Sequence, residues 1–312
     1  MSEQSLIFGC AVTSAESEAQ ACLLAESVRA YGGRFSSAPI WAFSPRGATK
    51  KAFRYSKRTA AVFEMLAVET KQVEIDPVVH GFPFAGKVLA SAAAEEQAAG
   101  QADALVWLDP DSIIFQEPGA LLLEPGKALG CRPVDHVLIG SPMDQPADAF
   151  WNTIYRSCGV SSKAIFPMTT SADQIVIRPY INAGMLVVRP GIGLLRGWRD
   201  RFRELLAAGI FERFFAQDSL YKIFLHQAIL TGVILASLTE VQIQTMSHLV
   251  NYPMHMHGQY PLERRPARMN DLISGRYDTF FHDKAWPALF PSEEPLRGWL
   301  ARQVIAYGLV KG

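Results

Sequence analysis

Short apolar runs alternate with amphipathic stretches along the first 190 residues of the chain. The first run, SLIFGCAVT, precedes a stretch with apolar residues at helical spacing, and Thr13 with Glu16 has the spacing of a capping box. Further runs predict strands at Pro39–Phe43, near Val73–Ile75, up to Leu108, at His136–Gly140 and at Gly184–Val188. An alanine-rich stretch over 86–100 predicts a helix. Strands alternating with helices predict an α/β fold with a mixed, mainly parallel sheet flanked by helices.

The rest of the chain is predicted to be mostly helical and then irregular. Long amphipathic stretches occupy roughly 194–208 and 211–235, and the segment after about residue 250 is rich in proline and arginine. No internal repeat, low-complexity tract or linker divides the sequence. We therefore expect a single domain over 1–312, with a core over 1–190, a helical region from about 190 and a C-terminal flap.

The composition narrows the class of partner. Thirty Lys and Arg residues balance 30 Asp and Glu residues, and only 19% of the 312 residues are charged. Clustered cations give proteins affinity for nucleic acids and anionic membranes, so this balance argues against either as the main partner. The four cysteines are too scattered for a zinc or redox site. The sequence shows no signal peptide and no apolar stretch approaching the roughly 20 residues of a membrane span, so we expect a soluble cytoplasmic protein without a transmembrane segment.

Two aspartates that directly follow an apolar run are the clearest candidates for chemistry. In ALVWLDPDSIIF, only Pro110 separates Asp109 from Asp111. Carboxylate oxygens suit a hard divalent ion such as Mg²⁺ or Mn²⁺, which completes its shell with water and substrate phosphates. Ligands of parallel sheets bind beyond the carboxyl ends of the strands, where this pair is predicted to lie. A strand-end turn with Pro110 as its rigid corner is the alternative.

Several motifs in order resemble one enzyme family. LVWLDPDSIIF is similar to the DxD strand end of glycosyltransferases with the GT-A fold. YINAGMLVVRP, at 180–190, resembles the asparagine–alanine–glycine segment of retaining, family-8-like members such as the glycogenin and lipopolysaccharide galactosyltransferase group. HQAILTGVI at 226–234 and FFHDKAWP at 280–287 are similar to two later segments of that family. The resemblance implies a GT-A-like nucleotide-diphospho-sugar transferase fold, with the nucleotide-sugar and metal core over 1–190 and a helical acceptor region after it.

The resemblance also implies a metal-dependent hexosyltransferase. Its donor would be a nucleotide-diphosphate sugar, with a UDP-sugar as the first candidate. Its acceptor would be an unknown saccharide, lipid or protein. Asp109, Asp111 and His282 would hold a Mn²⁺ or Mg²⁺ that bridges the two phosphates, and Lys284 would contact the diphosphate. The cation and the lysine would stabilise the leaving group electrostatically, without covalent work by the protein.

The remaining roles that the resemblance implies concern the donor sugar and the nucleoside. Asn182, Ala183 and Gly184 would lie along the donor sugar. Gln227 would lie close to the anomeric carbon or the acceptor, so that Asn182 and Gln227 are the candidate catalytic residues. The residues that would hold the nucleobase and ribose follow the first strand: Cys10, Ala11, Val12 and Thr13. Asp109 would also lie near the ribose or the sugar.

The chain departs from the family pattern at three places, which leaves other readings open. His226 precedes Gln227 where many members have aspartate, His282 and Lys284 are only two residues apart, and Pro110 is stiffer than the usual middle residue of DxD. A non-catalytic or degenerate sugar-nucleotide-binding protein is the first alternative. A structural interaction module of a cell-envelope assembly is the second.

The segment NYPMHMHGQYP contains a competing metal candidate. His255 and His257 are one residue apart, and on an extended chain such side chains point to the same side, which permits joint ligation. A histidine pair on a loop surface is the alternative. Asn251 in the same segment would face the donor or the acceptor by resemblance, or would simply form a turn.

Overall fold

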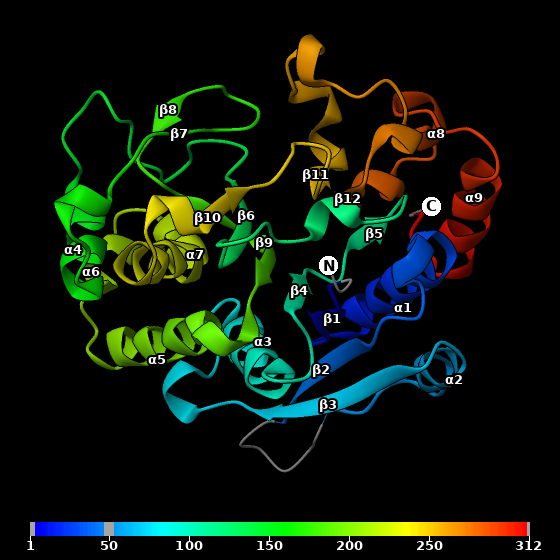
Figure 1. The fold of residues 1–312 in the computed structure, drawn as a ribbon, viewed down its shortest axis with the longest axis horizontal. Coiled ribbons are helices and arrows are strands. Elements are labelled where there is room, and N and C mark those ends of the chain that lie inside the picture. The colour runs from blue at the N-terminus through cyan, green and yellow to red at the C-terminus, as the bar shows by residue number, and fades with distance from the viewer. Residues whose placement is uncertain (1–3, 47–52, 311–312) are drawn as a thin grey trace.

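The computed structural model describes residues 4–46 and 53–310 (Figure 1). A seven-stranded central sheet has the strand order β10-β6-β9-β4-β1-β2-β3. β9 runs antiparallel to both of its neighbours, β4 and β6, whereas the other neighbouring pairs are parallel. The strands of this sheet are β1 (Leu6–Ala11), β2 (Ile40–Arg46), β3 (Val68–Glu74), β4 (Ala104–Leu108), β6 (Leu129–Pro133), β9 (Ile181–Val188) and β10 (Ile243–Thr245). The predicted α/β fold with a mixed, mainly parallel sheet is confirmed.

Helices cover both faces of the sheet because successive side chains of a strand alternate between the faces. On β1, Ile7 joins an apolar cluster with residues of α3, α4, α5 and α7, whereas Phe8 joins a second cluster with residues of α1 and α2. Figure 1 shows α3, α5 and α7 to one side of the strands and α1 to the other. The helices are α1 (Ala15–Tyr31), α2 (Lys57–Met65), α3 (Ala85–Ala98), α4 (Ala149–Cys158), α5 (Leu194–Ala207), α6 (Glu212–Phe215), α7 (Ser219–Ser237), α8 (Trp286–Leu289) and α9 (Leu296–Ala306).

The strand predicted at His136–Gly140 is wrong. β6 ends earlier, at Pro133, and residues 134–140 form a loop in which Leu138 has a positive φ of 44°. Val134 and Ile139 of this loop are nevertheless buried in the first cluster. Apolar residues that a loop packs into the core therefore produced the pattern of a strand.

Two helix starts also differ from the sequence predictions. Ser14 and Ser17 form the capping box of α1, in place of Thr13 and Glu16. The helix predicted over 211–235 is divided into α6 and α7, because Asp218 caps the second helix by accepting a hydrogen bond from the Leu220 amide at 2.8 Å.

α7 is a core helix, although its length and composition alone would allow it to span a membrane. An 18-residue stretch of this helix has a mean hydropathy of 1.4, and 61% of that stretch is buried inside the protein. The helix packs against α4, α5, α6 and β9. Its buried polar residues Gln227 and Thr231 accept hydrogen bonds from main-chain amides of β9. The apolar surface of α7 is thus used within the fold.

The C-terminal segment returns to the carboxyl ends of the central strands. It contributes two strands to a second sheet, and a third apolar cluster joins residues of this sheet to residues of α8 and α9. In this sheet Arg276 pairs with Ser112, one residue after Asp111. The short strands are β5 (Ser112–Ile114), β11 (Tyr252–Pro253) and β12 (Ser274–Arg276), with β7 (Met168–Thr169) and β8 (Val176–Ile177) in a separate pair.

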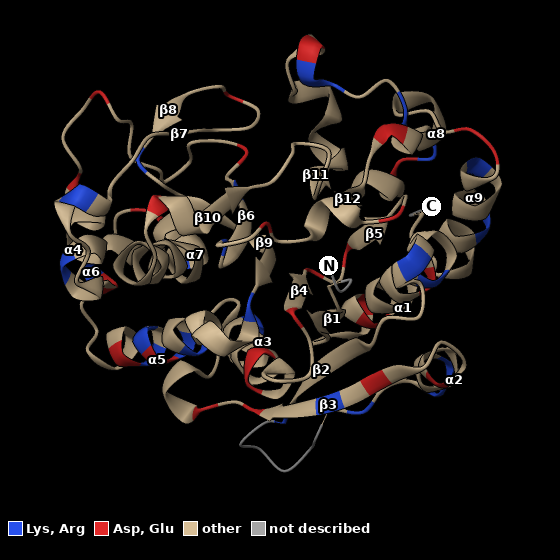
Figure 2. Ribbon diagram, viewed as in Figure 1, with Lys and Arg blue, Asp and Glu red and all other residues tan. Residues whose placement is uncertain are grey.

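Charges of both signs lie side by side on the outer elements. Figure 2 shows Lys and Arg together with Asp and Glu along α5 and along β3. Arg201 pairs with Glu204 at 2.9 Å on α5, and Lys71 pairs with Glu69 at 3.1 Å on β3. Charges of both signs are therefore interspersed on these two elements.

Candidate functional site

Asp109 and Asp111 lie at the carboxyl end of β4, as the sequence predicts. The Asp109 amide donates to the Gly184 carbonyl at 2.8 Å, which ties this end of β4 to β9. The Asp111 carboxylate accepts a hydrogen bond from the Asp278 amide at 3.2 Å, and its carbonyl accepts one from the Tyr277 amide at 3.0 Å. Main-chain bonds to β9 and to the segment after β12 therefore fix both aspartates.

Two cavities meet at Asp109. The larger measures about 600 Å³ and also has Ala11, Thr13 and Asp111 in its wall. The smaller measures about 280 Å³ and has Asn182, Gly184 and Gln227 in its wall. Residues that line both cavities are Phe84, Lys87, Asp109, Arg276 and Asp278. Two larger hollows, of about 770 and 730 Å³, lie away from the aspartate pair.

The segment after β1 contributes to the larger cavity with alternate residues. Ala11 and Thr13 line it, whereas Cys10 and Val12 are buried in the second apolar cluster. Burial raises the pKa of the Cys10 thiol to about 12, so this side chain remains protonated and apolar. Of the four residues predicted to hold the nucleoside, Ala11 and Thr13 are the two whose side chains face the cavity.

The start of β9 is held by two side-chain amides. Gln227 accepts from the Ala183 amide at 2.9 Å, and Asn182 accepts from the Gly184 amide at 2.7 Å. A Cβ on Gly184 would lie 2.9 Å from Asn182 Oδ1 and 3.1 Å from Asp109 Oδ2. A side chain at position 184 would therefore displace the Asn182 amide where β9 passes the aspartate pair. The family resemblance implies that these residues share one site, and the structure brings them together.

The two C-terminal residues predicted for this site are not brought to it. His282 and Lys284 line neither cavity, and Lys284 is exposed. Within 4–46 and 53–310, no group of three His, Cys, Asp or Glu side chains is arranged to hold a metal ion. The predicted trio of Asp109, Asp111 and His282 is thus not assembled.

The competing histidine pair is divided between two environments. His255 lines the smaller cavity, and its Nε2 lies 3.9 Å from an Asp278 carboxylate oxygen. The His257 ring stacks on Phe290 with 3.9 Å between ring centroids, and its Nδ1 lies 3.1 Å from the Tyr252 hydroxyl. The two rings do not share a site.

Two cations in the site were missed by the sequence analysis. Lys87 Nζ lies 2.5 Å from Asp109 Oδ1, and Arg276 faces Asp111 from the end of β12. Lys87 is the one cation of the alanine-rich helix α3. A single lysine at the start of such a helix could have been recognised in the sequence as a candidate site residue. Arg276 had no such signal, because its position depends on how the C-terminal segment packs.

Three carboxylates, those of Asp109, Asp111 and Asp278, lie with the two cations Lys87 and Arg276 in the wall of the larger cavity. Burial, and then the charge of Asp109, raises the pKa of Asp111 to about 6, although Arg276 and Lys87 act in the opposite direction. Two carboxylates together with water and substrate phosphates form an ordinary Mg²⁺ shell. Asp109 and Asp111 therefore fit a divalent cation, without His282 as a ligand.

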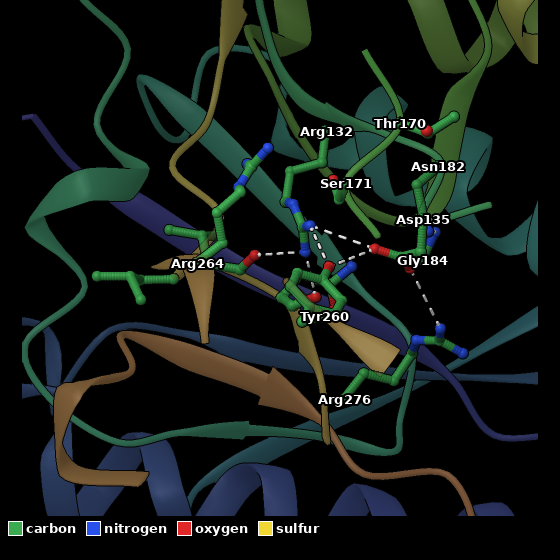
Figure 3. Close-up of polar contacts among 12 residues, drawn as sticks. Arg132, Asp135, Thr170, Ser171, Asn182, Gly184, Tyr260, Arg264 and Arg276 are labelled. Carbon is green, nitrogen blue, oxygen red and sulfur yellow. Dashed lines mark hydrogen bonds and ion pairs between the residues drawn. The ribbon is translucent and has the colours of Figure 1, made fainter. Parts of the chain in front are cut away.

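A buried polar network supports the far side of the smaller cavity (Figure 3). Arg132 donates to Asp135 Oδ1 at 3.2 Å and to the Tyr260 hydroxyl at 2.9 Å, and that hydroxyl donates to the same oxygen at 2.7 Å. Arg132 also donates to the Asn251 carbonyl at 2.7 Å. The other oxygen of Asp135 faces Arg276. Asp135 thus lies between two guanidinium groups: it is hydrogen-bonded to Arg132, whereas Arg276 lies 3.9 Å from its other oxygen.

Asn251 and His226 are fixed in uncommon environments beside this network. Asn251 is buried with a positive φ of 51°, and its Oδ1 has no hydrogen-bond partner. His226 stacks on Phe84 with 4.4 Å between ring centroids, and its Nδ1 lies 3.0 Å from the Ile223 carbonyl. Burial, and then Lys87, holds the pKa of His226 well below its usual value, so the ring is neutral.

Comparison with known protein families assigns the chain. A family model described as the Rhodobacterales glycosyltransferase domain matches residues 9–237, which is more than half of the sequence. The chain belongs to this family. The glycosyltransferase therefore carries its aspartate pair, its Asn182–Gly184 segment and Gln227 within the matched region. No curated protein sequence matches it.

Solved structures show the fold of this glycosyltransferase. An active-site mutant of LgtC is 14% identical with a TM-score of 0.52, over 97% of this chain and 95% of that chain. Galactosyltransferase LgtC with donor and acceptor sugar analogues is 16% identical with a TM-score of 0.47, over 98% and 96%. Core-mannan synthase A from Aspergillus fumigatus, in a Mn/GDP form, is 6% identical with a TM-score of 0.47, over 78% and 73%. The first similarity shows a shared GT-A-like fold, which confirms the fold predicted by resemblance.

Proposed function

We propose that this glycosyltransferase moves a hexose from a nucleotide-diphosphate sugar to a saccharide, lipid or protein acceptor, with retention of configuration. UDP-sugars are the first donors to test. The observation that carries the proposal is the pair of cavities that meet at Asp109. The larger has the volume for a nucleotide and the smaller for a sugar. Their junction, at the carboxyl ends of parallel strands, is where the diphosphate would lie.

The charged residues at the junction suit a diphosphate leaving group. Asp109 and Asp111 would hold a Mn²⁺ or Mg²⁺, which when bound supplies Lewis-acid stabilisation of the leaving group. Lys87 pairs with Asp109 and so keeps this carboxylate in place in the shared wall of the two cavities. His282 has no part in the proposal, because its side chain lines neither cavity.

Asn182 and Gln227 are the proposed contacts to the donor sugar and the reacting centre. Both line the smaller cavity, and the side-chain oxygen of each is engaged by a main-chain amide of β9. Those bonds fix the orientation of the two side chains before a substrate enters, which lowers the reorganisation that catalysis requires. Gly184 lies in the wall of the same cavity, where a Cβ would press on Asn182 and Asp109.

Nucleotide binding tests the proposal. UDP and GDP, each with and without Mn²⁺, are added to the wild-type protein and its melting temperature is measured. We expect one nucleotide to raise it, and Mn²⁺ to enhance the shift. Asp109→Ala is expected to abolish the Mn²⁺ enhancement, whereas Asp200→Ala, at an exposed position on α5, keeps it. The absence of any shift in the wild-type protein would contradict the proposal, and binding without donor hydrolysis or transfer would support a sugar-nucleotide-binding protein instead.

A further inference from the structure

Arg276 lies at the junction of the two cavities with its hydrogen-bond donors uncommitted. It is the last residue of β12 and lines both cavities, and its side chain is 20% exposed. Its nearest carboxylate oxygens, on Asp135 and Asp278, lie at 3.9 and 4.0 Å, outside hydrogen-bond distance. Its buried Nε has no hydrogen-bond partner. Such a guanidinium is attracted by the surrounding carboxylates but is not bonded to them.

The position of this side chain is set by groups that are themselves well bonded. Asp135 is held through its other oxygen by Arg132 and Tyr260, as Figure 3 shows, and Arg276 extends from β12 toward it. A buried donor without a partner destabilises the protein, so a ligand that brings acceptor oxygens to this side chain is favoured. Planar guanidinium groups match the oxygens of phosphates through paired hydrogen bonds.

The other cations considered for the diphosphate are not available in the same way. Lys284, which the family resemblance implies for this role, is exposed and lines neither cavity. Lys87 lines both, but its ammonium group lies 2.5 Å from Asp109 Oδ1 and is engaged there. Arg276 is thus the cation at the junction whose guanidinium nitrogens have no carboxylate oxygen within hydrogen-bond distance.

We propose that Arg276 binds the diphosphate of the donor and stabilises the charge of the departing nucleoside diphosphate, in the role that the resemblance implies for Lys284. The inference rests on the proposed function. During transfer, the bond between the anomeric carbon and the β-phosphate oxygen breaks, and its electron pair stays on that oxygen. The acceptor oxygen bonds to the carbon, and the acceptor proton passes to the released diphosphate. Arg276 donates hydrogen bonds to the diphosphate oxygens as this charge develops.

Calorimetric titration of the protein with UDP and with UMP tests this role, because the two nucleotides differ only in the β-phosphate. If the protein prefers guanine nucleotides, GDP and GMP take their place. Wild-type protein, Arg276→Ala, Arg276→Lys and Arg268→Ala are compared. We expect Arg276→Ala to weaken diphosphate binding about tenfold or more and monophosphate binding far less. The affinity of Arg276→Lys for the diphosphate should lie between those of the wild type and Arg276→Ala, because an ammonium group keeps the charge without the paired geometry. Arg268→Ala, at a side chain 52% exposed, should bind as the wild type does.

The outcomes separate this inference from the proposed function. A wild-type protein that binds neither diphosphate overturns the proposed function, and the role of Arg276 with it. If the wild type binds and Arg276→Ala binds the diphosphate equally well, only the role of Arg276 is overturned. An equal loss for diphosphate and monophosphate also overturns it, since that result indicates a structural role. Should Arg276→Ala fail to fold, the same comparison is decided by Arg276→Lys.

Discussion

Asp111 destabilises the protein at neutral pH. Its pKa is raised to about 6 by burial and by Asp109, whereas an aspartate in the unfolded chain titrates near pH 3.9. Between these values the folded protein binds more protons than the unfolded chain, so stability falls as the pH rises. The contribution of Asp111 is therefore most favourable below about pH 4 and is lost above about pH 6.

Asp111→Asn is expected to stabilise the ligand-free protein at pH ~7.5, because the substitution removes the charge. The gain should be on the order of 1–3 kcal/mol and should shrink as the pH falls toward about 4. Melting temperatures of the variant and the wild type across this range provide the measurement. Asp200→Asn, on exposed α5, should show no such trend. A difference that does not depend on pH would contradict this explanation.

Gly184→Ala tests the close passage of β9 past the aspartate pair. The new methyl group would press on Asn182 Oδ1 and Asp109 Oδ2, and we expect donor hydrolysis to fall about tenfold or more. Gly191→Ala is the matched control, because a Cβ there meets nothing within 4 Å. Equal hydrolysis rates for the two variants would show that this contact does not matter for the reaction.

β9 and α7 act as one unit in holding the smaller cavity. The Ile181 amide donates to the Thr231 hydroxyl at 3.0 Å, and the Ala183 amide donates to Gln227 at 2.9 Å. These two bonds fasten the start of β9, which has no strand partner at Asn182. The orientation of the predicted catalytic residues therefore depends on the register between a strand and a helix.

Thr231→Val is expected to lower the free energy of unfolding by about 1–3 kcal/mol, because it leaves the Ile181 amide without its buried acceptor while keeping the side-chain volume. Denaturation with urea provides the measurement. Thr70→Val, at an exposed position on the edge strand β3, should change stability much less. Equal stabilities of Thr231→Val and the wild type would show that this bond does not fasten β9.

Elements whose boundaries are marked in the sequence could be predicted. α3 is an alanine-rich stretch between glycines, and β4 is an apolar run ended by Asp109, so both were located from composition alone. The loop at 134–140 and the break at Asp218 could not be located, because buried loop residues and a helix cap in an amphipathic stretch leave the apolar pattern unchanged.

The same division applies to the site. The family resemblance placed Asp109, Asn182 and Gly184 in one site, and the structure brings them together at adjacent ends of the neighbouring strands β4 and β9. Arg276 and Asp278 could not be predicted there, because they meet Asp111 across a sequence separation of more than 160 residues, through packing of the C-terminal segment. The family resemblance placed His282 and Lys284 there by motif order, and the structure places Arg276 and Asp278 there instead.

The whole molecule combines a balanced surface with charge concentrated at one place. Equal numbers of cations and acids give a net charge of zero, and outer elements such as α5 carry both signs. At the meeting point of the two cavities, however, charges of both signs face each other, four of them half-buried and that of Asp278 exposed: Lys87, Asp109, Asp111, Arg276 and Asp278. The C-terminal segment supplies two of these residues, so the cavities are complete only when it packs onto the central sheet.

Release of nucleoside diphosphate from a panel of UDP- and GDP-sugars is the most direct test of the central claim that a sugar-nucleotide donor reacts at Asp109. Wild-type protein and Asp109→Asn are compared with Mn²⁺ present. The wild type is predicted to cleave at least one donor, and Asp109→Asn to cleave it about 100-fold more slowly. Cleavage at the same rate by the folded variant, or no cleavage of any donor by the wild type, would contradict the claim.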